Sequence, residues 1–113
     1  MARVVAVFDD LLLGSNVQGT LRAAGHDVAL AGPAADPPGG CDLLVVDLGS
    51  DGFDGVEAAA RMRPPGARVL GVYSHVHHDQ RARAEAAGFD LVVPRSRLAR
   101  EGAALVERLL SRG

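Results

Sequence analysis

Several residue types are absent or rare in this sequence of 113 residues, and each shortage excludes a class of protein. Cys41 is the single cysteine, so an intramolecular disulfide is impossible and a cysteine-based metal site would need other ligands. Tryptophan is absent and aromatic residues make up 4%, which argues against stacking platforms for single-stranded nucleic acid. The formal net charge of −2 gives no electrostatic basis for binding nucleic acid or an anionic membrane.

Long apolar runs are also missing. No segment approaches the roughly 20 apolar residues of a membrane span, and the first residues lack the pattern of a signal peptide. We therefore expect a cytoplasmic protein. Lysine is absent, and every basic residue is arginine. The length suits one domain, expected over residues 1–113, with one hydrophobic core.

Short apolar runs are the main structural signal. They are continuous rather than alternating, which is typical of strands buried on both faces in a parallel sheet covered by helices. The expected strands, of which the second is the weakest, are residues 4–8, 27–31, 43–46, 69–73 and 91–93.

Helix signals lie between most of these runs. Ser15 opens a capping-box pattern, and Gly25 is the expected stop of that helix. Segments 56–62 and 76–87 have helical composition, and Ser96 is the expected cap of a last helix. The alternation of strands and helices predicts an α/β fold with a doubly wound parallel sheet.

Residues 32–41 break this pattern. They include three prolines and three glycines, which will not hold a helix. Ten extended residues reach about 33 Å. That is enough to return along a strand of about 16 Å and to step two strands sideways by about 10 Å. We therefore expect five strands with only four full helices, and an under-covered sheet face beside the second strand.

Polar side chains follow the expected strands at the edge where parallel sheets form binding sites. Asp9 and Asp10 follow the first run, Asp47 follows the third, and Ser74 and Arg95 follow the fourth and fifth. Carboxylates about 4 Å apart repel by about 4 kcal/mol per pair at an effective dielectric near 20, so such a cluster needs a cation or must hold protons. Mg²⁺ suits oxygen ligands of this kind. A carboxylate beside it can act as a nucleophile toward a phosphoryl group.

This ordered set resembles the response-regulator receiver domain of bacterial two-component signalling. The family has an acidic pair after the first strand, an aspartate such as Asp47 after the third, and a pair such as Asp54-Gly55 that follows at the usual spacing. Segment 88–95 is similar to the family's Gly-x-Asp-(x)₄-Lys segment, and the resemblance covers residues 3–110. It implies a flavodoxin-like five-stranded parallel sheet in the order 2-1-3-4-5, with the second crossover helix replaced here by a Pro/Gly loop.

The resemblance also implies roles for the strand-end residues. Asp47 is the implied phosphoacceptor, Ser74 is the implied switch hydroxyl, and Arg95 stands where the family has its phosphoryl-contacting lysine. The implied Mg²⁺ ligands are Asp9, Asp10, Asp47 and the backbone carbonyl of Gly49. The implied partners are a sensor histidine kinase or phosphotransfer protein and a downstream protein, and a second copy of the chain is a further candidate. Neither nucleic acid nor a membrane is an expected partner.

Departures from the family pattern leave a second function open. The guanidinium of Arg95 is planar and forked, whereas the lysine usual in the family carries a compact ammonium charge. Ser96 stands where the family usually has proline. Val92 occupies the position of an aromatic whose rotation reports phosphorylation. The alternative is a pseudo-receiver that works without phosphorylation as a protein–protein interaction module, with Arg95 paired to Asp47. A small enzyme such as a phosphatase is disfavoured, because no general base or second catalytic group is evident.

Plainer interpretations remain for several of these residues. Asp9 and Asp10 can be carboxylates that cap the following helix, and Ser74 can cap the helix after its strand. The histidines within 75–78 can bind a metal ion or sense pH, but a solvated helix start is favoured. The three leucines at 11–13 cannot all face the core from a single helix turn, so one of them can be exposed at the pocket rim as a candidate partner contact, but packing across the loop is favoured.

Overall fold

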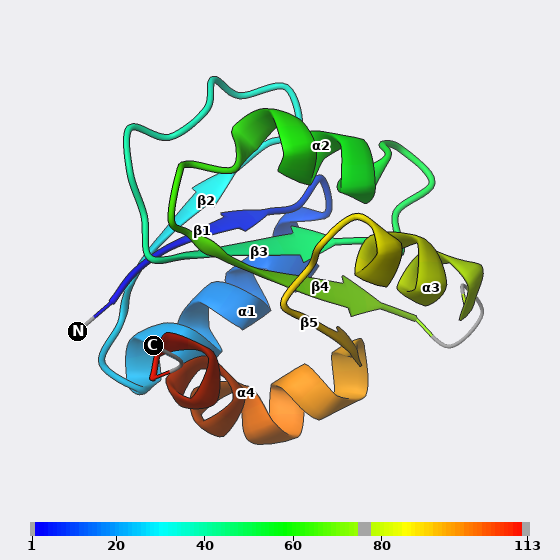
Figure 1. Ribbon diagram of the computed structural model, residues 1–113. Helices are drawn as coiled ribbons and strands as arrows, with labels where there is room; N and C mark the ends of the chain where they lie inside the picture. Colours follow the sequence, from blue (N-terminus) through cyan, green and yellow to red (C-terminus); the bar gives the residue numbers. More distant parts are fainter. Residues whose placement is uncertain (1, 75–77, 112–113) are drawn as a thin grey trace.

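The computed structural model describes residues 2–74 and 78–111, within which four helices surround a five-stranded sheet (Figure 1). The elements are β1 (Arg3–Val7), α1 (Leu11–Ala23), β2 (Asp27–Ala31), β3 (Leu43–Asp47), α2 (Gly55–Met62), β4 (Arg68–Tyr73), α3 (His78–Ala86), β5 (Leu91–Pro94) and α4 (Arg95–Leu110). All strand pairs are parallel, in the order β2-β1-β3-β4-β5. The predicted fold class and strand order are therefore confirmed.

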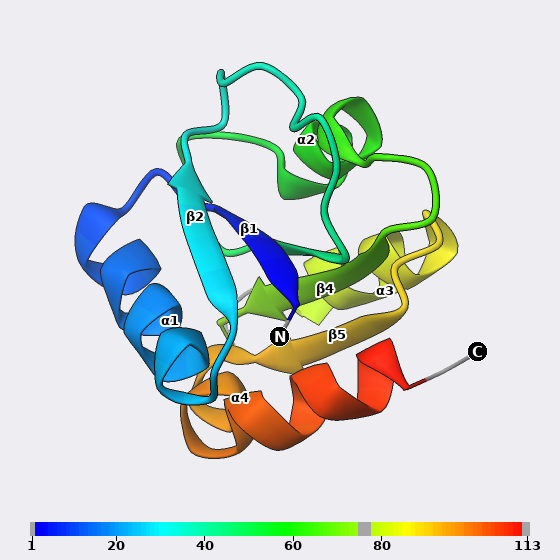
Figure 2. The same ribbon diagram turned by 90° about the vertical axis from the view of Figure 1, so that its left-hand side faces the viewer.

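Helices cover the sheet on both faces. Helices α1 and α4 lie on one face, while α2 and α3 lie on the other (Figures 1 and 2). Successive side chains of the central strand β3 point to opposite faces. Leu43 and Val45 join the cluster beneath α1 and α4, and Leu44 and Val46 join the cluster beneath α2. The continuous apolar run at 43–46 is thus explained by burial on both sides of the sheet.

Helix α1 begins earlier than the sequence predicted. Asp10 is its N-cap, and the Asp10 carboxylate accepts hydrogen bonds from the backbone N–H groups of Leu12 and Leu13. The prediction that Ser15 opens the helix is wrong, because Asp10 precedes it and already satisfies the first free N–H groups of the helix. The predicted stop is confirmed, since Gly25 follows the helix with φ 94°, in the left-handed region that favours glycine.

Helix α4 also begins before the predicted cap. Pro94 takes the N-cap position without a side-chain hydrogen bond, and Arg95 is the first helical residue. The expectation that Ser96 caps this helix is wrong, since Ser96 lies inside the first turn. This start matters for the site, because it fixes Arg95 at the end of β5.

The chain passes from β2 to β3 through residues 32–42 without a helix. The Arg61 side chain of α2 donates a hydrogen bond to the Ala35 carbonyl at 2.9 Å and another to the Pro33 carbonyl. Ala35 packs against the cluster beneath α2, whereas Ala29 of β2 is exposed. Figure 2 shows this crossover running over the sheet beside α2.

The histidine side chains at 75–78 lie outside the described part of the chain, so the interpretation of that cluster stays a prediction. Within residues 2–74 and 78–111, no helix is long and apolar enough to cross a membrane.

Candidate functional site

The strand register brings the polar strand ends to one edge of the sheet. Asp47, the last residue of β3, pairs with Val72 of β4. Ser74 follows β4, and Arg95 opens α4 directly after β5. Asp9 and Asp10 come shortly after the end of β1, which is the other strand that pairs with β3. Parallel strands thus place all the predicted site residues around the same edge.

Asp47 and Arg95 form the centre of this edge. The Asp47 side chain is 1% exposed, and the Arg95 side chain is 36% exposed. Arg95 donates from Nη2 to both carboxylate oxygens of Asp47, at 3.1 and 3.3 Å. A carboxylate this deeply buried needs a cationic or hydrogen-bonding partner. Arg95 therefore compensates the buried charge from within the protein.

Gly49 adds a second donor to this contact. Its backbone N–H donates to Oδ1 of Asp47 at 2.9 Å. A Cβ at Gly49 would lie 2.9 Å from Nη2 of Arg95 and 3.3 Å from the backbone nitrogen of Ser74. A side chain at position 49 would thus crowd the Arg95 guanidinium at the place where it contacts Asp47. The sequence pointed to the Gly49 carbonyl and missed this N–H, although an aspartate that bonds the N–H two residues later is a recurrent turn.

The Nε atom of Arg95 is buried and has no hydrogen-bond partner within the described part of the chain. Leaving a buried donor unsatisfied costs about 1–3 kcal/mol. An anionic oxygen that reached Nε would therefore gain a charge-assisted hydrogen bond. The site has spare capacity for an anion beside Asp47.

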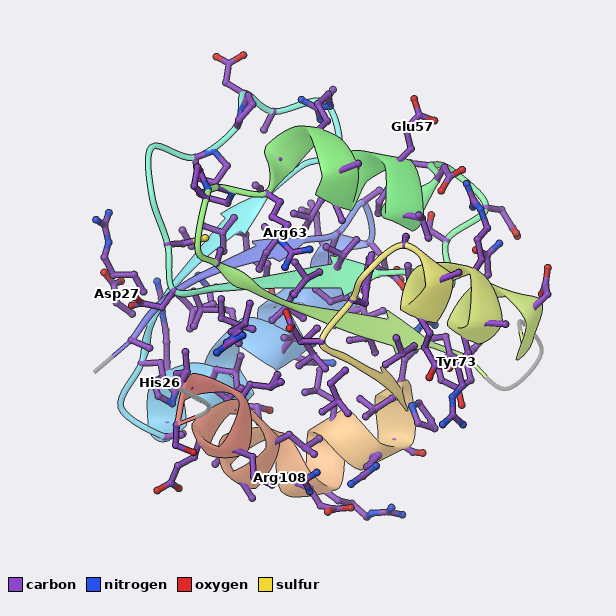
Figure 3. All side chains as sticks on the ribbon, viewed as in Figure 1. His26, Asp27, Glu57, Arg63, Tyr73 and Arg108 are labelled. Carbon is purple, nitrogen blue, oxygen red and sulfur yellow. The ribbon has the colours of Figure 1, made fainter. Side chains whose placement is uncertain are left out.

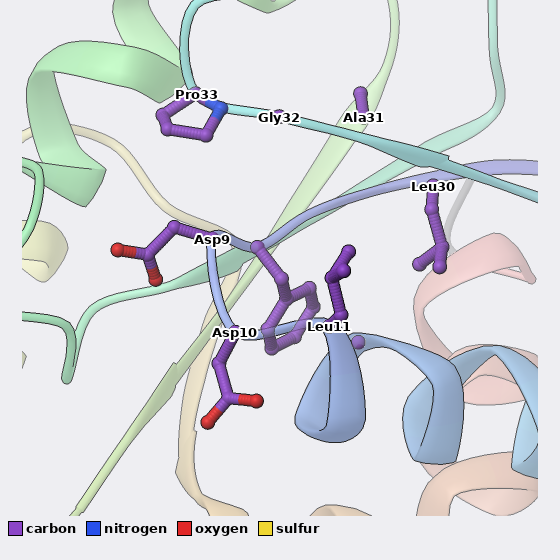
Figure 4. A pocket seen from close by; sticks show the side chains of 9 residues that line it. Asp9, Asp10, Leu11, Leu30, Ala31, Gly32 and Pro33 are labelled. Carbon is purple, nitrogen blue, oxygen red and sulfur yellow. The ribbon is translucent and has the colours of Figure 1, made fainter.

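Asp9 and Asp10 accept hydrogen bonds from groups other than Arg95. Oδ1 of Asp10 accepts from Leu12 and Leu13 at 3.0 and 3.1 Å, so the interpretation of Asp10 as a helix cap is confirmed. Oδ2 of Asp9 accepts from the Ser50 hydroxyl at 2.7 Å, a contact that the sequence did not predict. Figure 4 shows the two carboxylates directed to different sides of the β1–α1 turn.

These contacts bear on the expected Mg²⁺ site. Within residues 2–74 and 78–111, no three metal-ligating side chains of the His, Cys, Asp or Glu type lie close enough together to hold a metal ion. Asp9, Asp10 and Asp47 each accept from protein donors instead. The arrangement does not fit the implied Mg²⁺ site, and Mg²⁺ stays a prediction.

The neighbourhood of Val92 differs from the family's aromatic switch. Val92 is buried in a small cluster with Leu48, Tyr73 and Ala84 beneath α3. Tyr73, labelled in Figure 3, is the buried aromatic of this cluster, and it lies on β4 rather than β5, while the partly buried Phe89 packs against the same cluster. A hydrogen bond with Tyr73 is the main cause that raises the pKa of Arg81 above its usual value, so the tyrosine is linked to α3.

Several solved structures with a similar architecture are response regulators or their receiver domains. A putative response regulator from Chloroflexus aurantiacus has a TM-score of 0.81 at 20% identity, with 98% of each chain covered. The receiver domain of NtrX from Brucella abortus has a TM-score of 0.78 at 19% identity, over 97% of this chain and 99% of that one.

This chain has the fold of a response-regulator receiver domain. A LuxR-family two-component response regulator from an Aurantimonas species shares that receiver fold with a TM-score of 0.78 and 25% identity, over 98% of this chain and 86% of that one. The chain spans 26% of a longer NtrX chain. No family model matches the sequence, and no curated protein matches it.

Proposed function

We propose that this chain is a receiver module of two-component signalling in which Asp47 accepts a phosphoryl group. The observation that carries the proposal is the contact of Arg95 with the buried Asp47, together with the spare Nε donor of the same guanidinium. A phosphoryl group on Asp47 would bring anionic oxygens to a cation that already lies there. Ser74, after the neighbouring strand, is the proposed switch hydroxyl.

The proposed transfer exchanges one bond to phosphorus for another. A carboxylate oxygen of Asp47 attacks the phosphorus of a phosphohistidine on a sensor kinase or phosphotransfer protein. The new O–P bond replaces the P–N bond, and the imidazole leaves and takes up a proton. The product is an aspartyl phosphate, whose extra negative charge lies beside Arg95.

The proposal includes several expectations from the resemblance. Mg²⁺ is the expected cation, and binding it would require Asp9 and Asp10 to leave the contacts described above. The chain is expected to act in the cytoplasm as a single non-enzymatic module that passes its signal to a downstream protein. Neither nucleic acid nor a membrane is part of the proposal.

A second candidate is a pseudo-receiver that binds partners without phosphorylation. Arg95 donates to both oxygens of Asp47, and Asp9 and Asp10 have protein donors of their own. The charge of Asp47 is then balanced permanently inside the protein. This arrangement favours a module whose output depends on its surface alone.

One experiment separates the two candidates. Wild type and the Asp47→Asn variant are treated with acetyl phosphate or beryllofluoride, with and without Mg²⁺, and followed by intact mass and amide NMR shifts. Asp36→Asn, at an exposed loop position, is the matched control. Modification that needs Mg²⁺ and disappears only in Asp47→Asn supports the receiver. An unmodified, folded wild type refutes it and supports the pseudo-receiver.

A further inference from the structure

Three large hydrophobic side chains are exposed on the described surface, and two of them line one cavity. Leu11, Leu12 and Leu30 are 77%, 74% and 36% exposed, and they are the exposed large hydrophobic residues among those that the structure describes. Leu11 and Leu30 line a cavity of about 320 Å³ between the start of α1 and the end of β2 (Figure 4). Leu12 follows Leu11 in the first turn of α1.

The core does not use two of these leucines. Leu13, their neighbour, packs against the main core cluster, but Leu11 and Leu12 remain in water. Single exposed leucines are ordinary, whereas a group of them around a hollow is typical of an interaction surface. The cost of exposing this group is therefore best explained by a partner that covers it.

Small residues keep the cavity open. Gly14, Ala31 and Gly32 form parts of its wall. A Cβ at Gly14 would lie 3.2 Å from Cβ of Phe8 and 3.4 Å from Cδ2 of Leu30, so even a methyl group there would crowd the floor. On the β2 side, the chain continues into a loop rather than a helix, which leaves that side of the hollow without a covering element.

The negative charge beside the cavity indicates what kind of partner would fit it. Asp9 and Asp10 lie on the rim, and none of the nine lining residues is basic. A segment that carries both apolar and basic side chains matches both features of the surface.

We propose that the cavity lined by Leu11 and Leu30 docks a basic amphipathic segment of a partner protein. An apolar side chain of the partner fills the cavity, and its lysine or arginine side chains pair with Asp9 and Asp10. Helices that lay an apolar face into a groove are a common recognition mode. This docking does not depend on phosphorylation of Asp47.

The test uses the full chain and three synthetic peptides of helical periodicity. The first peptide carries leucine on one face and lysine on the other, the second replaces leucine by serine, and the third replaces lysine by glutamate. Calorimetry measures affinity, and amide NMR shifts locate the contact. We expect only the Leu/Lys peptide to bind, with shifts at residues 9–14 and 30–33.

Variants test the surface itself. The double variant Leu11→Ser, Leu30→Ser should bind the Leu/Lys peptide about tenfold or more weakly, since buried apolar area is lost. Asp10→Asn keeps the helix cap but removes a rim charge, and it should reduce both the affinity and its dependence on salt. Ala23→Ser and Asp27→Asn, both exposed and away from the cavity, are matched controls.

Several results would overturn the proposal. No binding of the Leu/Lys peptide, equal binding of the Leu/Glu peptide, or shifts confined to another face would each do so. An unchanged affinity in the leucine double variant, shown by thermal melting to be folded, has the same meaning. Self-association of wild type that the double variant abolishes would assign the surface to a second copy instead.

Discussion

Losing the partner should cost Asp47 more stability than it costs Arg95. Asp47 is almost completely buried, while Arg95 is 36% exposed. An arginine that loses its partner can turn toward water, whereas a buried carboxylate cannot. Removing a partner from a buried charge costs far more than the pair itself contributes.

We therefore expect Arg95→Met to lower the free energy of unfolding by about 3 kcal/mol at neutral pH. Asp47→Asn should cost about 1 kcal/mol, because it keeps the shape and leaves an arginine that water can reach. Urea unfolding of both variants measures the difference. Equal losses would contradict the burial asymmetry on which this expectation depends.

For the site residues, the sequence predicted where each lies along the sheet better than which hydrogen bonds it makes. The positions of Asp47, Ser74 and Arg95 could be predicted because each lies at the end of a buried strand. The Asp9–Ser50 hydrogen bond and the N–H of Gly49 could not, since they depend on the turn that the chain takes after β3. The role of Asp10 as a cap was one of two interpretations, and only the local geometry of α1 decides between them.

Helices α2 and α3 are joined by one carboxylate. Asp54 caps α2 by accepting from Val56 and Glu57, and it also accepts from the Arg83 guanidinium of α3 at 2.8 Å. The Arg83 hydrogen bond holds the pKa of Asp54 below its usual value. The folded state therefore gains stability above the unfolded pKa of about 4, and this gain is lost as the pH falls toward the lower folded pKa.

Arg83→Gln should lower the free energy of unfolding only slightly at neutral pH, because water screens this partly exposed pair. Once the pH has fallen below the lowered folded pKa of Asp54, the variant and the wild type should become equally stable, since Asp54 is then protonated in both. Chemical unfolding across about pH 2–7 measures this convergence. A constant gap down to the lowest pH would show that Arg83 acts through packing alone.

Arg61 ties the β2–β3 crossover to α2. Arg61→Gln removes the hydrogen bonds to the Pro33 and Ala35 carbonyls. We expect global stability to fall by less than about 1 kcal/mol, while amide exchange within residues 33–41 becomes faster. Hydrogen exchange followed by NMR or mass spectrometry tests this. Unchanged exchange in that segment would mean that other contacts hold it.

Strands were easier to predict than helix starts. The run at 43–46 is apolar because both faces of β3 are covered, and this signal does not depend on neighbours in the chain. The start of α1 could not be placed, because Asp10 and Ser15 both have capping chemistry. The start of α4 was missed since Pro94 occupies the N-cap without any side-chain signal.

The whole molecule has one tyrosine and no tryptophan, so Tyr73 dominates its intrinsic fluorescence. Tyr73 is 4% exposed in the cluster beneath α3, whereas the buried Leu44 belongs to the cluster beneath α2. If the sheet and both helical layers unfold together, Tyr73 fluorescence and far-ultraviolet circular dichroism should give coincident urea transitions. Leu44→Ala should lower both midpoints together, with a loss of about 3 kcal/mol. Separate transitions would show that parts of the molecule unfold independently.

The helix-free crossover at residues 32–42 has a consequence for protein engineering. Closing a longer loop is cheap, since each doubling of length costs only about 0.6 kcal/mol, but shortening it by three residues removes about 10 Å of reach. The segment should therefore accept grafted peptides or reporter tags and resist deletions. Such a graft would enter the molecule beside the leucine-lined cavity, where it could serve as a tethered ligand whose linker length is set by design.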